Sequence, residues 1–367
     1  MLALTEDGAV AINDETQDGR RLRWMRRLRA KILAKLKHGT RSGDILKRVR
    51  GCGYALGTTV EIRLVNGRAF VHGLKSCGNI WSCATCAQRI RVRRQQELET
   101  ALQTHTATGG SLMMLTLTMR HHERQSLEQL LNDLQASWTN LQSKSSFRHL
   151  MTFTPGFVRA LEITYGDNGW HPHFHIIIPV PVDMSEEAAR RRWEELRLPW
   201  SASLKTVSKQ KTNSHSIEHG FDLLWFGADA PNAAAYVTKL TKEATLSTSK
   251  TRGATRDPFT LLDDESAKST AMFLEYIEAT ADRRALTYSD GLKKILGIDF
   301  KPKSDEELAD DNDVVGEHAL EIMGSYWNQM SNRDQLGMME WCEFQFLYDT
   351  PPKVFVSSRG ACGADPP

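Results

Sequence analysis

The feature that most constrains the fold is a run of alternating histidines at 171–178, which reads His-Pro-His-Phe-His-Ile-Ile-Ile. An apolar segment at 157–165 and the turn Gly-Asp-Asn-Gly at 166–169 precede it. This pattern predicts two antiparallel strands joined by a tight turn. Successive strand side chains point to opposite faces, so Phe174 and Ile176 enter the core and the other face carries His171, His173 and His175.

Three imidazoles on one face of a strand are hard to explain by packing alone. Neutral imidazole is a good ligand for a divalent metal ion. The run therefore predicts a metal site on this strand. The alternative interpretation is that the histidines are structural and satisfied within the core.

Further strands and helices are expected on both sides of this hairpin. Residues 111–118 and 220–226 have the pattern of strands, and leucines at helical spacing predict an amphipathic helix over 127–141. Ser185 is a good N-cap for a helix at 186–196. Beyond residue 258 the pattern is mainly helical, including 317–330, and 341–347 is expected to be a strand. The chain is thus predicted to be an α+β protein.

Four of the six cysteines lie in one short window, at 52, 77, 83 and 86. Cys83 and Cys86 form a Cys-x-x-Cys chelating pair, and Cys52 and Cys77 can complete a tetrahedral thiolate site around a short hairpin with an Asn-Gly turn. His72 could replace one thiol. We expect structural Zn²⁺ in a reducing cytosol rather than a disulfide framework. Free reduced cysteines are the alternative.

The formal net charge of +2 hides a segregation of charge along the sequence. In the segment 20–50 nearly every charged residue is basic, a second basic cluster follows at 89–94, and 304–315 is acidic. A basic arm attracts polyanions, of which phosphate backbones are the usual ones. The other interpretation is a solvated helix face. The residues expected to bind DNA are Arg20, Arg21, Arg23, Arg26, Arg27, Arg89, Arg91, Arg93 and Arg94.

Nothing in the sequence predicts association with a membrane. It contains no run of about twenty apolar residues, which is the length that spans a bilayer. The N-terminus lacks the basic start and apolar core of a signal peptide. A cytoplasmic location is therefore expected.

A helix is predicted from Ala233 to about Glu243, after Pro231-Asn232. Tyr236 and Lys239 are three residues apart and share one face of this helix. Taken alone, such a pair is typical of a core tyrosine beside a solvated lysine. Its position downstream of the histidine strand gives it more weight.

The chain resembles the HUH endonucleases in the order of three motifs. These are the Leu-Thr-Leu-Thr strand at 115–118, the hairpin with His173-Phe174-His175 and the Tyr236-x-x-Lys239 helix. Within the HUH endonucleases the chain is most similar to the plasmid rolling-circle replication initiators with one active tyrosine. The resemblance covers roughly residues 50–300. It implies a ferredoxin-like antiparallel sheet and Mg²⁺ or Mn²⁺ held by His173, His175 and Glu162, with His171 beside them.

The same resemblance implies the chemistry. Tyr236, with Lys239 beside it, would attack a phosphodiester at an origin, form a 5′-phosphotyrosine and free a 3′-OH primer. The expected partners are origin DNA as duplex, hairpin and single strand, and a host helicase and polymerase in a prokaryotic cytoplasm. One departure concerns termination, because Asn232 stands where many relatives have a glutamate one turn before the tyrosine.

The resulting organisation has five segments: a basic arm at 1–50, a four-cysteine zinc module at 51–95, a nicking domain at 96–246, a mainly helical region at 258–350 and a flexible tail at 351–367. Three other functions stay open. They are an HUH-class transposase with the same chemistry, a histidine-triad nucleotide hydrolase whose central histidine is the nucleophile, and a non-catalytic zinc protein that binds DNA.

Overall fold

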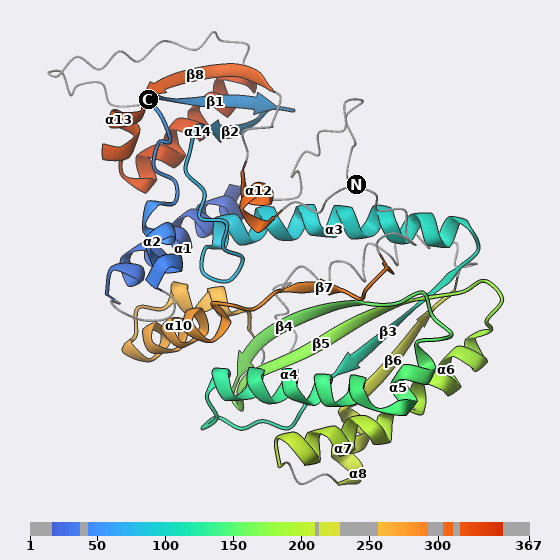
Figure 1. Ribbon diagram of the computed structural model, residues 1–367. Coiled ribbons are helices and arrows are strands. Elements are labelled where there is room, and N and C mark those ends of the chain that lie inside the picture. The colour runs from blue at the N-terminus through green and yellow to red at the C-terminus, as the bar shows by residue number, and fades with distance from the viewer. Residues whose placement is uncertain are drawn as a thin grey trace, which may run out of the picture. The chain divides into compact units, whose positions relative to one another are not determined.

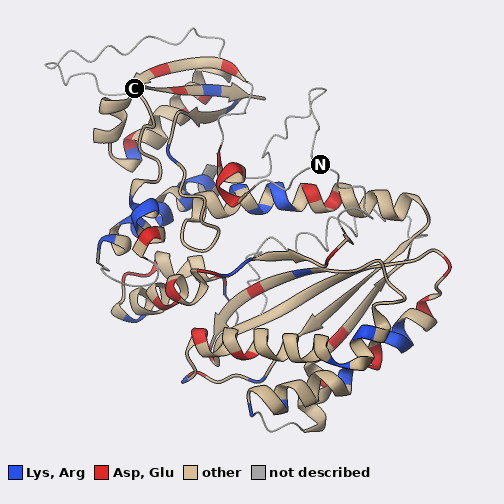
Figure 2. Ribbon diagram, viewed as in Figure 1, with Lys and Arg blue, Asp and Glu red and all other residues tan. Residues whose placement is uncertain are grey.

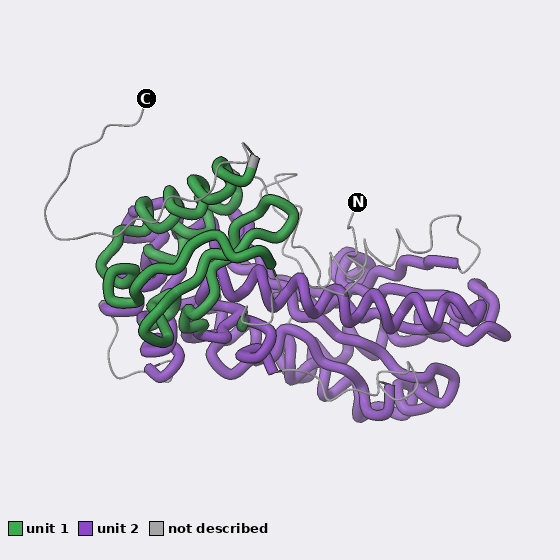
Figure 3. Tube along the Cα trace, turned by 90° about the horizontal axis from the view of Figure 1, so that it is seen from above, with its two compact units in different colours: residues 1–28, 51–76, 310–367 green, residues 29–50, 77–309 purple. Residues whose placement is uncertain are grey.

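The computed structural model describes residues 17–36, 43–209, 213–227, 256–292, 304–310 and 316–347. The chain divides into two compact units, coloured separately in Figure 3. Unit 1 comprises residues 1–28, 51–76 and 310–367, and unit 2 comprises 29–50 and 77–309. Unit 1 thus draws on four of the five segments predicted from the sequence.

Unit 2 is built around a five-stranded antiparallel sheet in the order β6-β3-β5-β4-β7 (Figure 1). The expected hairpin is present, and Glu162 pairs directly with His173 across it. The strands at 111–118 and 220–226 are also confirmed as β3 and β6, so the α+β prediction holds. The strand bounds are β3 Ser111–Leu117, β4 Val158–Gly166, β5 Gly169–Val180, β6 Phe221–Phe226 and β7 Leu286–Tyr288.

Helices cover both faces of this sheet. On one face, Leu98 and Leu102 of α3 pack on apolar residues of β3, β4 and β5, including Met114 and Ile177. On the other face lies α4, where Trp138 contacts Phe174 edge-to-face with ring centroids 6.2 Å apart. The helices of unit 2 are α2 Gly43–Gly51, α3 Ala84–Ala107, α4 Leu127–Ser143, α5 Ser145–Leu150, α6 Glu186–Glu194, α7 Arg197–Val207, α8 Ser214–His219, the 3-10 helix η1 Pro258–Asp263, α10 Ala267–Thr280 and α12 Asp305–Ala309.

Helices α4 and α6 form for the reasons predicted from the sequence, which are an apolar stripe in α4 and a serine N-cap in α6. The leucines of α4 at 127, 130, 131, 134 and 141 are all buried. The Ser126 side chain caps its N-terminus by accepting a hydrogen bond from the Gln129 backbone. Ser185 caps α6 in the same way. No helix of the described ranges is long and apolar enough to cross a membrane.

Unit 1 has its own three-stranded antiparallel sheet, in the order β2-β1-β8. The Asn66-Gly67 turn joins β1 to β2 as predicted, with positive φ at both turn residues. Val60 and Ile62 of β1 pack with Trp327 and Met339 of the C-terminal helices. The elements are the start of α1 Gln17–Leu36, β1 Thr59–Val65, β2 Arg68–His72, β8 Glu317–Met323, α13 Gly324–Gln329 and α14 Asn332–Leu347.

Two sequence predictions in unit 1 are wrong. Residues 317–323, expected to be helical, form strand β8, because they pair with β1 along its free edge. Residues 341–347, expected to be a strand, continue helix α14, because Leu336, Met339 and Cys342 recur at helical spacing and enter the core together.

Candidate metal centre

The carboxylate of Glu162 and two histidine rings converge on one point of the unit 2 sheet. The Glu162 Oε2 atom lies 2.8 Å from Nε2 of His173 and 2.8 Å from Nε2 of His175. The two Nε2 atoms are 3.1 Å apart. All three side chains are nearly buried, with 8–11% of their surface exposed. The sequence predicted these three residues, and the structure brings them together.

The separations suit a divalent cation. Two ligand atoms that each lie about 2.1 Å from one ion, at right angles, are about 3.0 Å apart. The opposite ring nitrogens are also engaged: Nδ1 of His175 is 3.2 Å from the Thr116 hydroxyl, and Nδ1 of His173 is 3.4 Å from the His171 carbonyl. With an ion bound, a proton on Nδ1 of each ring would leave the Nε2 lone pair to face the ion. The donor set, two imidazoles and a carboxylate, therefore fits such an ion.

Glu162 is held as a carboxylate. Burial alone would raise its pKa, but the hydrogen bonds to His173 and His175 outweigh burial, and the pKa lies well below its ordinary value. An ionised carboxylate next to two imidazole nitrogens supplies the site with a negatively charged ligand. That charge favours a cation at this point.

His171 lies beside this group and is not part of it. Its Nε2 is 2.8 Å from the Thr118 hydroxyl, and its ring stacks on His121 at 4.7 Å between centroids. Burial, and the neighbouring imidazoles His173 and His121, lower its pKa to about 3, so the ring is neutral. Sequence reasoning missed the contacts of Thr116, Thr118 and His121. The alternation Leu-Thr-Leu-Thr next to the histidine strand could have indicated the two threonines.

The predicted nucleophile Tyr236, its neighbour Lys239 and the helix start at Asn232 lie outside the described residues. Of the tyrosines described in unit 2, Tyr165 and Tyr276 lie on the sheet face opposite the three ligand atoms, whereas Tyr288 pairs with Val158 on the ligand face. Tyr165 is an odd number of residues from Glu162 on β4 and points to the opposite face. Tyr276 is buried there too, stacked on Trp170, and burial raises its pKa. Burial raises the pKa of Tyr288 to about 12.

The four cysteines predicted to bind zinc form the other cluster of potential ligands among the described residues. The Sγ atoms of Cys52, Cys77, Cys83 and Cys86 all lie within 4.8 Å of one another, and all four side chains are buried. Sγ atoms of Cys77 and Cys86 are 3.5 Å apart. Four thiolates at about 2.3 Å from one Zn²⁺ would be separated by similar distances. His72 does not belong to this group.

Comparison with known proteins places the chain. The family described as replication protein matches residues 70–335, which is more than half of the sequence. The chain belongs to this replication protein (Rep) family. A protein rep of Streptomyces lividans is 28% identical, with 68% of this chain and 69% of that protein covered. A protein rep of Bacillus amyloliquefaciens is 23% identical, with 67% and 72% covered. No solved structure matches.

A shorter similarity is to a protein of another description. The neomycin resistance protein of Streptomyces cyanogenus is 28% identical to this Rep chain, with 32% of the chain and 33% of that protein covered. This alignment spans only a third of either sequence. It therefore supports no function for the Rep protein as a whole.

The basic arm of this Rep protein is partly built into unit 1. Arg20 forms a two-pronged ion pair with Glu343, at 2.7 and 3.0 Å, and Arg21 pairs with Glu340. Arg27 is 3% exposed, and its guanidinium lies over the Trp24 ring at 4.0 Å. The buried Arg20 and Arg27 stabilise the unit and are not presented to a phosphate backbone, whereas Arg21 is exposed. We therefore do not assign Arg20 and Arg27 to DNA binding; Arg23 and Arg26 are half-buried on the same helix.

The second basic cluster, on α3, contacts α12, which belongs to the acidic segment predicted from the sequence. Figure 2 shows the blue residues of α3 and the red residues of α12. Arg94 pairs with Glu97 at 2.9 Å and with Asp305 of α12 at 3.2 Å. The last carbonyls of α12 accept hydrogen bonds from Arg89 and Arg93. Arg91 stacks over the ring of Phe259, 5.6 Å from its centroid. In this structure the four arginines, which were predicted to bind DNA, make contacts within unit 2.

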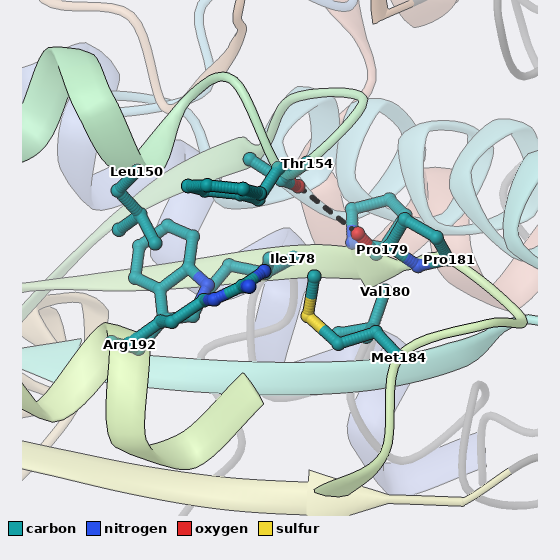
Figure 4. A pocket seen from close by; sticks show the side chains of 10 residues that line it. Leu150, Thr154, Ile178, Pro179, Val180, Pro181, Met184 and Arg192 are labelled. Carbon is teal, nitrogen blue, oxygen red and sulfur yellow. Dashed lines mark hydrogen bonds between the residues drawn. The ribbon is translucent and has the colours of Figure 1, made fainter. Parts of the chain in front are cut away.

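A small pocket of the Rep chain lies away from the metal centre (Figure 4). Ile178 and Val180 of β5 line it, and both point to the sheet face opposite His173 and His175. The Thr154 hydroxyl donates to the Pro179 carbonyl at 3.1 Å, and Arg192 stacks on the Phe153 ring. The pocket is mostly apolar and contributes no group to the metal centre.

Proposed function

We propose that this Rep protein initiates DNA replication by a metal-dependent nick in one strand at an origin. The observation that carries the proposal is the convergence of Glu162, His173 and His175 within 3.1 Å of one another on a sheet face. Membership of the Rep family supports the replication role. In this proposal the three residues hold Mg²⁺ or Mn²⁺. The ion would polarise the scissile phosphate and stabilise the negative charge that develops on its oxygens.

The nucleophile in this proposal is Tyr236. Its phenol oxygen forms a bond to phosphorus, the bond from phosphorus to the 3′ oxygen breaks, and the 3′ oxygen takes up a proton. The products are a 5′-phosphotyrosine and a free 3′-OH that a host polymerase can extend. A tyrosine of pKa about 10 needs help to lose its proton at neutral pH, and Lys239 can supply it by stabilising the phenolate.

Two observations support Tyr236. Of the tyrosines described in unit 2, Tyr165 and Tyr276 lie on the opposite face of the sheet, and Tyr288 is half-buried with a raised pKa. A buried phenol with a raised pKa is a poor nucleophile. Tyr236 also follows the metal strand in the order that the HUH endonucleases show.

The fold proposal is that unit 2 contains a ferredoxin-like core. The chain passes through β3, α4, β4, β5, α6–α8 and β6, and these four strands lie in the order β6-β3-β5-β4. This split β-α-β arrangement, repeated once, supports the assignment. We also propose that Cys52, Cys77, Cys83 and Cys86 bind a structural Zn²⁺, because four buried thiols form one compact group.

The activity can be tested directly. The protein is incubated with supercoiled plasmid and with single-stranded DNA in the presence of Mn²⁺, and covalent adducts are separated by denaturing electrophoresis. Nicking with a covalent protein–DNA adduct is expected. His173→Ala or His175→Ala should abolish the adduct and leave duplex binding largely intact, because most affinity comes from phosphate contacts.

Other outcomes would select other functions. Release of mononucleotides without an adduct would indicate a histidine-triad hydrolase, and binding without cleavage a non-catalytic DNA-binding protein. An adduct that joins to a second DNA site in preference to priming synthesis would indicate a transposase. Nicking at the full rate after treatment with EDTA would contradict the metal centre.

A further inference from the structure

The loop that follows β3, residues 119–125, borders the candidate metal centre. On the ligand face of the sheet, the pair Met114 and Ile177 packs against α3. The next pair on this face is Thr116 and His175, and His175 belongs to the candidate metal centre. Continuing in that direction, Thr118 contacts His171. Residues 119–125 follow Thr118, so the loop begins at the end of the sheet that is farther from the α3 contacts. A DNA strand that enters the ligand face from this end would pass beside the loop.

Aromatic stacking fixes the loop to the site. The rings of His121 and His171 are 4.7 Å apart at an interplanar angle of 18°, and the His171 and His173 rings are 4.9 Å apart. At the turn between β4 and β5, Gly169 has φ +83°, and a Cβ there would approach the Glu123 Cα to 2.8 Å. The absence of a side chain at Gly169 lets the loop sit directly against the hairpin.

The loop is also ordered internally and basic on its outside. The Gln125 backbone N–H donates to the His122 carbonyl at 3.1 Å, and that of Arg124 donates to His122 Nδ1 at 3.3 Å. Arg120, His122 and Arg124 are exposed, and Glu123 is the single acidic residue of the loop. Guanidinium groups suit phosphate oxygens because they donate two hydrogen bonds in a fixed geometry.

We propose that residues 119–125 bind the backbone of the single DNA strand that is cut. Arg120 and Arg124 contact phosphates beside the scissile one, and His121 is a positioning residue that keeps the loop in register with the metal centre through its stack on His171. The proposal rests on the proposed nicking function. It identifies a binding surface for a single-stranded polyanion that the histidine and tyrosine motifs do not contain.

The test measures how affinity for a 30-nucleotide poly(dT) strand depends on salt, by fluorescence anisotropy without divalent metal. Each phosphate contact to a single strand contributes about 0.7 to the slope of log K against log[salt], so Arg120→Gln/Arg124→Gln should reduce the slope by about 1.4. The matched control is Arg148→Gln/Arg191→Gln, which removes two exposed arginines from α5 and α6 and should leave the slope unchanged. A loop variant with the wild-type slope, or wild-type protein that does not bind poly(dT), would overturn the proposal.

A second comparison isolates the stacking role of His121. His121→Phe keeps a ring for the stack and should retain the wild-type concentration dependence of nicking on single-stranded plasmid DNA. His121→Ala should raise KM several-fold with a smaller change in kcat, and equal behaviour of the two variants would contradict the positioning role. Wild-type protein that binds poly(dT) but forms no covalent adduct would refute the proposed nicking function and leave the salt-slope result to decide the binding surface.

Discussion

Trp138 links the packing of unit 2 to the metal centre, and its replacement gives a quantitative prediction. The side chain is 2% exposed and makes edge contacts with Phe147, Phe157 and Phe174, at ring separations of 5.5, 5.3 and 6.2 Å. Phe174 occupies the position on β5 between the two histidine ligands, on the opposite face. Loss of the indole should therefore destabilise unit 2 and loosen the strand that carries His173 and His175.

The magnitude follows from this burial. Removing a buried tryptophan side chain costs about 3–5 kcal/mol. Since a domain is stable by only about 5–15 kcal/mol, Trp138→Ala should remove about a fifth or more of the stability. With a urea slope of about 2–3 kcal/mol per molar, the unfolding midpoint should fall by about 1–2.5 M.

Urea unfolding followed by circular dichroism measures this change, and affinity for Mn²⁺ in the folded variant measures its effect on the site. The control is Leu198→Ala, an exposed apolar residue of α7, which should shift the midpoint by less than about 0.3 M. A similarly small shift in Trp138→Ala would refute the reasoning that this aromatic cluster supports β5.

Three further predictions concern charges and ligands. Arg20→Gln should destabilise unit 1 by about 3 kcal/mol, measured by urea unfolding, because the buried Glu343 carboxylate would lose its cationic partner and keep only the hydrogen bond from the Ala69 backbone, and adding Glu343→Gln should recover part of that loss. Purified protein should carry about one Zn²⁺ per chain, and Cys83→Ser should lose it; full zinc content in that variant would contradict the site. Glu162→Gln should weaken Mn²⁺ binding at least tenfold in titration calorimetry, since it removes the negative ligand, and an unchanged affinity would exclude Glu162 from the centre.

The sheet of unit 2 and its ligand group were predictable because they depend on local pattern. Alternation places His173 and His175 on one face, and the short turn at 166–169 sets the register that brings Glu162 opposite His173. A pairing of neighbouring strands needs no information from distant parts of the chain. The amphipathic helix α4 was predictable for the same reason.

Features that depend on distant partners were not predictable. Strand β8 pairs with β1 more than 250 residues earlier, and its own residues Glu317, Ala319 and Leu320 favour a helix. Arg20 and Glu343 are 323 positions apart, so a count of basic residues could not distinguish an internal ion pair from a surface for DNA. The same limit applies to Arg94 and Asp305.

The central claim is that this Rep protein cuts DNA by attack of Tyr236 under the control of the metal centre. The most direct measurement is mass spectrometry of the adduct formed with single-stranded plasmid DNA and Mn²⁺, after digestion with nuclease and protease. Wild-type protein should carry a 5′-linked nucleotide on the peptide that contains Tyr236. Tyr236→Phe, which removes only the hydroxyl, should bind the same DNA and metal without forming an adduct. An adduct on Tyr165 or Tyr288, or one that persists in Tyr236→Phe, would contradict the claim.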